Sequence, residues 1–458
     1  MPKQSKMKHP VVFGTLLLSS TGILCKIIGF FYKIFLSRII GAEGLGIYHL
    51  IFPISTICFA VTVAGISTAL TKYVAEYQET DPLAPKRLLC CALTFSTLLS
   101  VAVMGLVYVF STFIAENILL EPRCAPFIRI LAYSIPLASV HACIHGYYYG
   151  RKKATVPAFS SLVEQSVRVL FVMLAFYMQQ ENGSSLDASI AVWGLVVGEG
   201  AAFLFCITML FFSPQISNEP KVKSSVKHPG RKLLLYALPL STNRLTLTLF
   251  GSFESILIPS RLCLFGYSQS DALSVYGVLT GMALSVVFFP TVFTNSVSVM
   301  ILPAISEADS RNDREKIRQT IRRTIFGSLL LGTFCTFGLF VCGKWVGIYL
   351  FGNSLAGKFI VLLSFICPFM FLTSILSSVL HGLGMPGYTF VFNLMGSLVR
   401  IFFVYVLIPV FGIKAYLMGM LCSQMVTSLL SVGAVVTYVK KGGVGDGRTA
   451  GHRPPFQG

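Results

Sequence analysis

Charged side chains are scarce in this sequence. Only 12% of its 458 residues are Asp, Glu, Lys or Arg, against roughly 25% in ordinary globular domains. The length alone would suggest about three soluble domains, but so few charges could not cover their surfaces. Disorder is excluded as well, because 13% of the residues are aromatic and disordered segments are poor in aromatic residues. A bundle of membrane-spanning helices is the class that remains.

Motifs for metal binding or catalysis are also missing. The 12 cysteines show no C-x-x-C spacing, and most lie in apolar runs, as Cys25, Cys58 and Cys206 do. We interpret them as small buried hydrophobic residues and expect no metal site. No P-loop, H-E-x-x-H or G-x-S-x-G motif occurs, and the carboxylates between the apolar runs are isolated rather than paired. We therefore expect no catalytic residues and no bound cofactor.

Twelve apolar stretches are each long enough to cross a membrane as a helix, which takes about 20 residues for a ~30 Å hydrocarbon core. They are continuous runs rather than alternating segments of about 10 residues, so a closed β-barrel is excluded. The first run is also too long for a cleaved signal peptide. We predict an all-α polytopic membrane protein with twelve transmembrane helices. The predicted spans are residues 11–37, 47–71, 88–114, 126–149, 155–178, 189–212, 233–258, 273–302, 324–350, 359–382, 388–410 and 413–438.

Positive charge outweighs negative charge by a factor of two. The chain has 36 Lys and Arg against 18 Asp and Glu, an excess that would suggest nucleic-acid binding in a soluble protein. Most of these bases lie before the first span and in every second connection between spans. This asymmetry follows the rule that basic loops stay in the cytoplasm. We therefore expect both termini in the cytoplasm and no nucleic-acid partner.

The chain reads as two related halves of six spans. Because six is even, both halves enter the membrane in the same direction, as in transporters built from parallel repeats whose substrate site lies between the halves. The matching positions are Ser37-Arg38 with Ser260-Arg261, His145-Gly146 with His381-Gly382, and Val167-Arg168 with Val399-Arg400. The predicted divisions are a lobe at 1–212, a basic cytoplasmic linker at 213–232, a second lobe at 233–439, and a disordered cytoplasmic tail at 440–458, which is rich in Gly and Pro.

The first predicted helix has one small, cationic face. Thr15, Ser19, Gly22, Lys26, Gly29, Lys33 and Ser37 follow one another at helical spacing, so they form a single stripe. A central Lys that faces lipid costs about 2.5–3.5 kcal/mol, so Lys26 should face a cavity or an acidic partner. Lys33 could do the same, or it could extend to the membrane surface as a long basic side chain does.

Two arginines lie within later spans. Glu164 and Arg168 have the i,i+4 spacing of an intrahelical ion pair and could neutralise each other or line a polar face of the bundle. Arg400 has no acid nearby in its own helix and shares its face with Asn393, Gly396 and Ser397. It would need water, carbonyl groups or an anionic ligand.

The remaining intramembrane charges lie in the sixth and seventh spans. Asn243 and Glu254 are eleven residues apart, which places them within about 20° of each other on a helix. Glu254 could bind a coupling cation or proton, or it could pair with a base of the first helix. Glu199 is a candidate of the same kind, and Arg244 is a further base in the seventh span.

Three long segments carry a family resemblance. They are GILCKIIGFFYKIFLSRIIGAEGLGIYHLIFPI (residues 22–54), AGISTALTKYVAEY (64–77) and LTGMALSVVFFPTVFTNSVSVMILPAISEA (279–308). In these segments the chain resembles the stage V sporulation protein B family of the multidrug/oligosaccharidyl-lipid/polysaccharide (MOP) exporter superfamily, which is related to lipid II flippases.

The resemblance implies two six-helix lobes around a central cavity and a flippase that works by alternating access in the cytoplasmic membrane. Its substrate would be a polyprenyl-pyrophosphate-linked saccharide, such as a peptidoglycan precursor. Lys26 lies where related flippases carry a basic residue in the first helix, and with Lys33, Arg244 and Arg400 it would form a cationic substrate site. Ser285 lies near a position where those flippases have Arg, and the chain stops after twelve spans where several relatives have an extra pair.

The partners implied are the lipid-linked oligosaccharide, the bilayer and the cell-wall synthesis machinery. Transport could be coupled to Na⁺, H⁺ or the membrane potential. One alternative is a cation-coupled multidrug exporter of the same superfamily, although its cavity should be acidic and the spans here hold more bases than acids. The other is a membrane-embedded glycosyl- or phosphotransferase, which would usually need carboxylates that this chain does not bring together in its loops.

Overall fold

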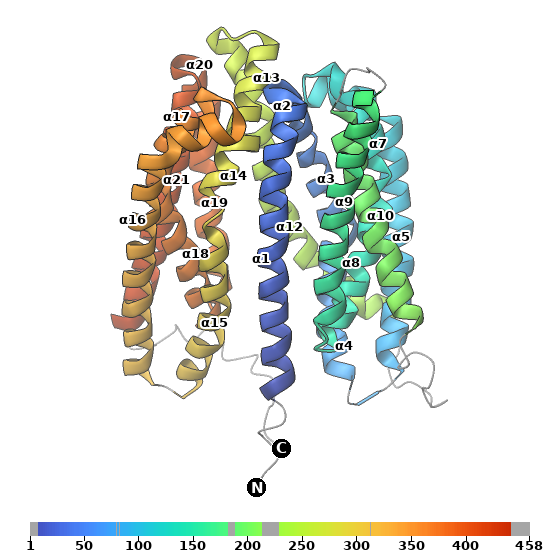
Figure 1. Ribbon diagram of the computed structural model, residues 1–458. Coiled ribbons are helices and arrows are strands. Elements are labelled where there is room, and N and C mark those ends of the chain that lie inside the picture. The colour runs from blue at the N-terminus through green and yellow to red at the C-terminus, as the bar shows by residue number, and fades with distance from the viewer. Residues whose placement is uncertain are drawn as a thin grey trace. The chain divides into compact units, whose positions relative to one another are not determined.

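A computed structural model describes residues 8–78, 80–81, 83–181, 188–212, 229–311 and 313–440. These residues are helical apart from short turns, and no strand occurs among them (Figure 1). Thr15, at the start of the predicted cationic stripe, lies in a helix, and its side chain is not described. The prediction of an all-α chain is confirmed.

The first part of the chain holds the helices up to the predicted linker. Short π-helical or 3₁₀ segments, labelled η, lie between several of them. The elements are α1 (Lys8–Ile39), α2 (Gly41–Leu50), α3 (Phe52–Phe59), η1 (Ala60–Ala64), α4 (Gly65–Tyr77), α5 (Ala84–Val109), α6 (Ser111–Phe113), η2 (Ile114–Ile118), η3 (Pro122–Cys124), α7 (Ala125–Ala132), α8 (Ser134–Gly150), α9 (Thr155–Glu181) and α10 (Ser189–Phe211).

The second part begins with a helix of 37 residues. Its elements are α12 (Pro229–Phe265), α13 (Gln269–Gly277), η4 (Val278–Ala283), α14 (Leu284–Val287), α15 (Thr291–Ser310), α16 (Arg314–Phe351), α17 (Ser354–Leu363), η5 (Ser364–Ile366), α18 (Cys367–Gly382), α19 (Pro386–Phe402), η6 (Phe403–Leu407), α20 (Ile408–Phe411) and α21 (Ile413–Lys440).

Within the described residues, ten helices are long and apolar enough to cross a membrane. The count becomes eleven when the helices at Pro122–Ala132 and Ser134–Gly150, bent by 42° against each other, are taken as one span. Each of the twelve predicted stretches is largely helical, and the first of them is covered by α1. The chain is therefore a multi-pass membrane protein, and the twelve-helix layout agrees with the structure.

One predicted span is broken. The stretch 273–302 is not a continuous helix, because the chain turns at Phe288, Phe289 and Pro290 between α14 and α15. Pro290 has no N–H to donate to a carbonyl one turn earlier, so an α-helix cannot continue through it without losing a hydrogen bond. Pro290 instead precedes the first residue of α15.

The chain divides into two compact units. Unit 1 comprises Met1–Phe289, Gly343–Ile360 and Ile401–Tyr416, and unit 2 comprises Pro290–Cys342, Val361–Arg400 and Leu417–Gly458. Of the predicted linker, 213–228 lies outside the described residues, and residues 229–232 form the first turn of α12. The tail after Lys440 also lies outside them. The predicted division into lobes at 1–212 and 233–439 therefore stays a prediction.

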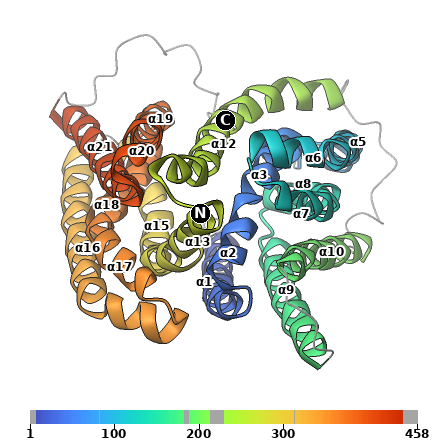
Figure 2. The same ribbon diagram turned by 90° about the horizontal axis from the view of Figure 1, so that it is seen from above.

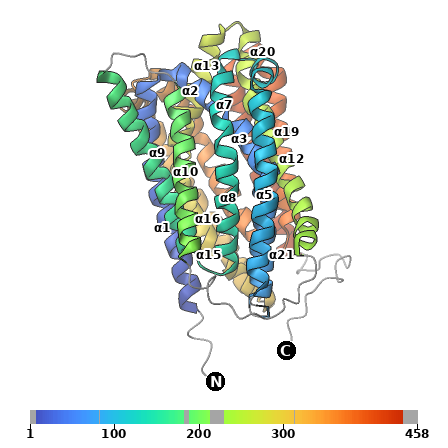
Figure 3. The same ribbon diagram turned by 90° about the vertical axis from the view of Figure 1, so that its right-hand side faces the viewer.

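The core of unit 1 lies between α4, α5, α8, α10 and α12. Its fully buried side chains include Leu70, Leu88, Ile144 and Leu233. Figure 3 shows α8 between α5 and α10, so α8 is covered on both sides by apolar helices. Most side chains of α8 are consequently buried.

The core of unit 2 lies between α15, α16, α18 and α21, which Figure 2 shows end-on as a group. Ile305, Leu376, Val379 and Leu380 are fully buried there. Apolar side chains make up most of both cores, and the buried polar residues are mostly serines and threonines.

Candidate functional site

The two lysines of α1 lie in different surroundings. Lys33 donates from Nζ to Oγ of Ser285 on α14 at 3.1 Å, and Ser285 Oγ donates in turn to the carbonyl of Gly281 at 2.8 Å. Lys26 lies two turns earlier, on an exposed face of α1. A serine hydroxyl carries no charge, so this partner positions the ammonium group of Lys33 without neutralising it.

The predicted stripe of small residues on α1 changes character along the helix. Gly22 has no neighbour within 4 Å of the place where a Cβ would stand, whereas the same point at Gly29 lies 3.2 Å from Nε2 of Gln165 on α9. Ser37, at the end of the stripe, is buried and donates to the carbonyl of Ile34 at 2.7 Å. The stripe therefore runs from an exposed part at Lys26 to a packed part beside α9.

The ion pair predicted on α9 is present. Arg168 donates from Nη2 to Oε1 of Glu164, and both side chains are largely buried, with 16% and 21% of their surface exposed. At Gly198 on α10, a Cβ would stand 3.3 Å from Nε of Arg168. The missing side chain at that position is what allows α10 to approach the guanidinium group.

Glu199 is not part of this ion pair and lies beside a histidine instead. Its Oε2 lies 3.0 Å from Nε2 of His141 on α8. Ligand atoms of His141, Glu164 and Glu199 all lie within 4.8 Å of one another. Three helices, α8, α9 and α10, thus bring a base, two acids and an imidazole into one buried cluster.

Arg400 is held by serines. It donates from Nη1 to Oγ of Ser423 on α21 at 2.8 Å and from Nη2 to Oγ of Ser397, one turn earlier on α19, at 3.2 Å. Ser397 was expected on the face of Arg400, and Ser423 could not be expected from the sequence of α19 alone. Oγ of Ser423 donates to the carbonyl of Gly396 at 2.8 Å, so α19 and α21 are joined by hydrogen bonds at this point.

The candidate residues on α12 differ in how exposed they are. Asn243 and Arg244 are exposed, whereas Glu254 has only 7% of its surface exposed and accepts a hydrogen bond at Oε1 from the hydroxyl of Tyr416 at 2.8 Å. The structure therefore brings Glu254 to a tyrosine at the start of α21. A coupling role for Glu254, or a pairing with the first helix, stays a prediction.

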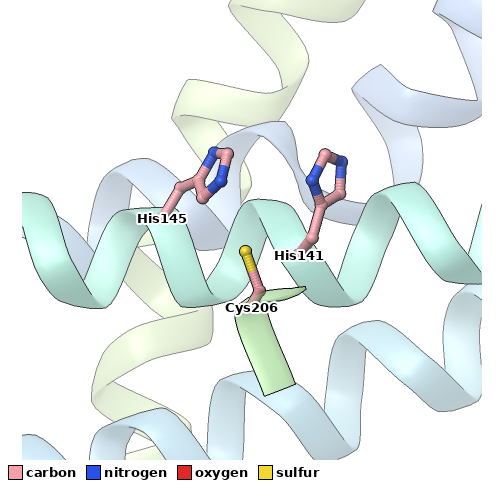
Figure 4. A group of neighbouring side chains, drawn as sticks. All are labelled: His141, His145 and Cys206. Carbon is pink, nitrogen blue, oxygen red and sulfur yellow. The ribbon is translucent and has the colours of Figure 1, made fainter. Parts of the chain in front are cut away.

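Three residues that the sequence analysis did not select lie together in unit 1. His141 and His145 project from one face of α8, and Cys206 on α10 points toward them (Figure 4). The signal available in the sequence was the spacing of four between the histidines, which places both on one side of a helix. C-x-x-C spacing does not detect this group, because Cys206 is far from both histidines in the chain and approaches them only in the fold.

With the fold and these contacts in place, the chain can be compared with known proteins. The sequence model of the family described as Polysaccharide biosynthesis protein matches residues 11–265, which is more than half of the chain. The chain belongs to this family. It is 26% identical to Stage V sporulation protein B of Bacillus subtilis (strain 168) over 441 residues, which cover 95% of this chain and 84% of that protein.

Two further similarities extend the comparison. Lipid II flippase MurJ of the same organism is 20% identical over 345 residues, which cover 71% of this chain and 63% of that protein. An inward-facing multidrug resistance MATE family transporter of the MOP superfamily matches with a TM-score of 0.73 at 12% identity, covering 93% of this chain and 98% of its own. The resemblance to stage V sporulation protein B is thereby confirmed, and the fold is of the MATE type.

Proposed function

We propose that this protein is a transmembrane flippase that moves a polyprenyl-pyrophosphate-linked saccharide across the cytoplasmic membrane, with both termini in the cytoplasm. The family is described by polysaccharide biosynthesis, and one relative is named as a flippase of lipid II. A MATE-type fold is that of a transporter. These three observations favour transport of a lipid-linked saccharide over an enzymatic reaction on it.

The observation that carries the proposal is Lys33, a base in α1, the first predicted span, whose ammonium group donates to a neutral hydroxyl. Two unit charges about 4 Å apart attract each other by about 4 kcal/mol at an effective dielectric constant of about 20. A pyrophosphate group carries about two negative charges, so it could gain this attraction at Lys33 and again at a second base such as Lys26. A neutral drug would gain nothing there, and a cationic drug would be repelled.

The transport cycle follows from the shape of such a substrate. Its charged headgroup must leave one aqueous phase and reach the other, while the polyprenyl chain can stay in the hydrocarbon. We propose alternating access, in which the headgroup moves through the protein with its charge compensated by these bases, and coupling to Na⁺, H⁺ or the membrane potential supplies the driving force. The cell-wall synthesis machinery would then take up the flipped product.

The two other candidate functions predict different behaviour. A cation-coupled multidrug exporter would move cationic compounds, and the likeness to MATE structures at 12% identity bears on the fold and not on the cargo. A membrane-embedded transferase would change its substrate chemically.

The test uses purified protein in liposomes that contain a fluorescent or radiolabelled lipid-linked precursor. We expect the precursor to become accessible to an impermeant reagent on the opposite side, chemically unchanged, at a rate that responds to an imposed membrane potential. Lys33→Gln should lower that rate at least tenfold, whereas Lys344→Gln, at an exposed lysine of α16, should not. Chemical conversion of the precursor would support the transferase, and export of cationic dyes without precursor movement would support the drug exporter.

A further inference from the structure

We propose that His141, His145 and Cys206 form a binding site for a transition-metal cation of the Zn²⁺ class inside unit 1. One ligand atom from each residue lies within 4.8 Å of the other two. The site is separate from the bases assigned to the substrate, and it does not depend on the proposed flippase function. The expectation of a chain without a metal site is revised by this geometry.

The arrangement of the helices fixes the three donors. His141 and His145 are four residues apart on α8, and their rings lie with centroids 5.0 Å apart at an interplanar angle of 63°. Cys206 reaches toward both from α10 (Figure 4). Bonds of about 2.0–2.1 Å from zinc to nitrogen and about 2.3 Å to sulfur require donor separations of about 3.3–3.8 Å. The observed separations of at most 4.8 Å exceed these values by no more than about 1.5 Å, a difference on the scale of side-chain rotation.

The ring nitrogens are arranged as in metal-binding histidines. Nε2 of His141 faces the carboxylate of Glu199 at 3.0 Å, while Nδ1 of the same ring is buried without a hydrogen-bond partner. Nε2 of His145 is also buried and unpartnered. Ligating histidines usually donate their second N–H to a carboxylate, which fixes the ring and leaves the other nitrogen for the metal. Oε2 of Glu199 lies close enough to Nε2 of His141 for this, but it makes no hydrogen bond in the structure, so the imidazole or the carboxylate would have to rotate to form one.

The cysteine has a partner that would also suit a bound metal. Cys206 is fully buried, and its Sγ donates to Oγ of Ser160 on α9 at 3.2 Å. Metal binding requires the thiolate. Loss of the thiol proton would let the hydroxyl of Ser160 turn and donate to the sulfur, so the hydrogen bond would be kept in the opposite direction.

Charge balance favours a divalent ion here. The thiolate of Cys206 and the carboxylate of Glu199 together carry two negative charges, which compensate a cation of charge +2 in surroundings where an uncompensated charge is costly. Glu164 is engaged by Arg168, so the alternative set of His141, Glu164 and Glu199 would have to break an ion pair before it could bind. Two imidazoles and one thiolate are ligands that Zn²⁺ prefers over Mg²⁺ or Ca²⁺.

The experiment titrates purified full-length protein in detergent with Co²⁺ under reducing, anaerobic conditions and records the absorption spectrum. We expect a sulfur-to-cobalt charge-transfer band in the near ultraviolet that saturates at one equivalent and disappears when Zn²⁺ is added. Cys206→Ser, which is nearly isosteric, should abolish the band, and His145→Ala should weaken Co²⁺ binding at least tenfold. Glu199→Gln should keep the band but lower the affinity about 10–100-fold, as loss of a carboxylate behind a ligating histidine does.

Two matched controls separate this site from adventitious thiols. Cys143→Ser changes a different fully buried cysteine, on α8, and Cys90→Ala removes an exposed cysteine. Neither change should alter the charge-transfer band. The absence of a charge-transfer band in the wild-type protein would overturn the proposal. So would a band that survives Cys206→Ser or is lost in Cys90→Ala.

Discussion

Two partly buried arginines of this protein are compensated in different ways. Arg168 on α9 binds the carboxylate of Glu164, and Arg400 on α19 donates to the hydroxyls of Ser397 and Ser423. Each follows a valine, and each lies against the next long helix of the chain, α10 for Arg168 and α21 for Arg400. The two positions therefore correspond in packing, and the contacts differ in kind, with a carboxylate at Arg168 and two hydroxyls at Arg400.

The pair on α9 allows a stability test. Arg168→Met should destabilise the protein by about 3–5 kcal/mol, because it leaves the carboxylate of Glu164 in a largely buried place without its base. The double variant Glu164→Gln/Arg168→Met should recover most of this loss. Thermal unfolding in detergent measures both. The control is Arg311→Met, which breaks the exposed i,i+4 pair with Glu307 and should cost less than about 0.5 kcal/mol. Equal losses for the two arginines would contradict this account.

Lys26 allows a test of charge rather than of packing. Lys26→Glu should abolish transport of the lipid-linked precursor while the protein stays inserted and abundant, because Lys26 lies on an exposed face of α1 and the change turns attraction of the pyrophosphate into repulsion. Lys26→Arg should keep substantial activity, since arginine retains the charge and binds phosphate well. Transport assays measure the activity of the two variants, and quantitative immunoblots measure their abundance.

The alternative for Lys26 is pairing with an acid, and a charge swap distinguishes it. In that case Lys26→Glu would lower protein abundance, and the addition of Glu254→Lys would restore folding and transport together. Rescue by the swap would argue against contact between Lys26 and the headgroup. We expect no rescue, because Glu254 is buried and bound by Tyr416.

At this scale, sequence reasoning succeeds where partners are close in the chain. The pair of Glu164 and Arg168 was predicted because a helix fixes the distance between i and i+4. The bond from Lys33 to Ser285 joins residues 252 positions apart, and the contact of His141 with Glu199 depends on how α8 packs against α10. No local spacing encodes either contact, so both required the structure.

Glycines set the distance between helices in both units. At Gly146 on α8, a Cβ would stand 2.7 Å from the carbonyl oxygen of Ser67 on α4, and at Gly382 on α18 it would stand 2.9 Å from that of Leu302 on α15. These two glycines follow His145 and His381, the positions matched in the predicted repeat. Each therefore allows its helix to lie against the backbone of an earlier one, and the shared arrangement agrees with a repeat.

Gly146→Ala should destabilise unit 1 by about 1–3 kcal/mol, since the methyl group meets a backbone oxygen that cannot rotate away. The matched control is Gly105→Ala on α5, where nothing lies within 4 Å of the added carbon. That change should be neutral or stabilise by about 0.5–1 kcal/mol through the better helix propensity of alanine. Thermal unfolding of the two purified variants tests the difference, and a tolerated Gly146→Ala would show that α4 and α8 are not held at this distance.

Hydropathy predicts the positions of the helices well, but it does not predict where the helices are interrupted. All twelve predicted stretches are largely helical, because helices satisfy the backbone of apolar runs of this length in a membrane. The π-helical turns η1 and η4 were not predicted, and residues 273–302 were predicted as one span, although Pro290 was expected to kink it. Such features shift the hydrogen-bond register without changing composition, so a hydropathy count does not register them.

At the scale of the whole molecule, the placement of bases is linked to the direction of insertion. The turn between α8 and α9 carries Arg151, Lys152 and Lys153, and α16 begins with Arg314 and Lys316. The turn between α16 and α17, by contrast, consists of Gly352 and Asn353. Alternation of basic and neutral connections is the pattern that orients a chain in the membrane. It follows from the sequence directly, because charge in a connecting loop does not depend on tertiary packing.

Single cysteines in a background without the 12 natural ones test this orientation. Thr155→Cys and Ser354→Cys place thiols at exposed positions beside the two turns and keep every base. We expect Ser354→Cys to react with an impermeant maleimide in intact cells and Thr155→Cys to react only after permeabilisation. The physical reason is that three bases next to position 155 are each attracted by about 1 kcal/mol to the anionic inner surface of the membrane and resist transfer across it. Full reaction of both thiols after permeabilisation is the control for reactivity. Labelling of Thr155→Cys in intact cells would indicate the opposite topology, with the basic turn between α8 and α9 outside the cell.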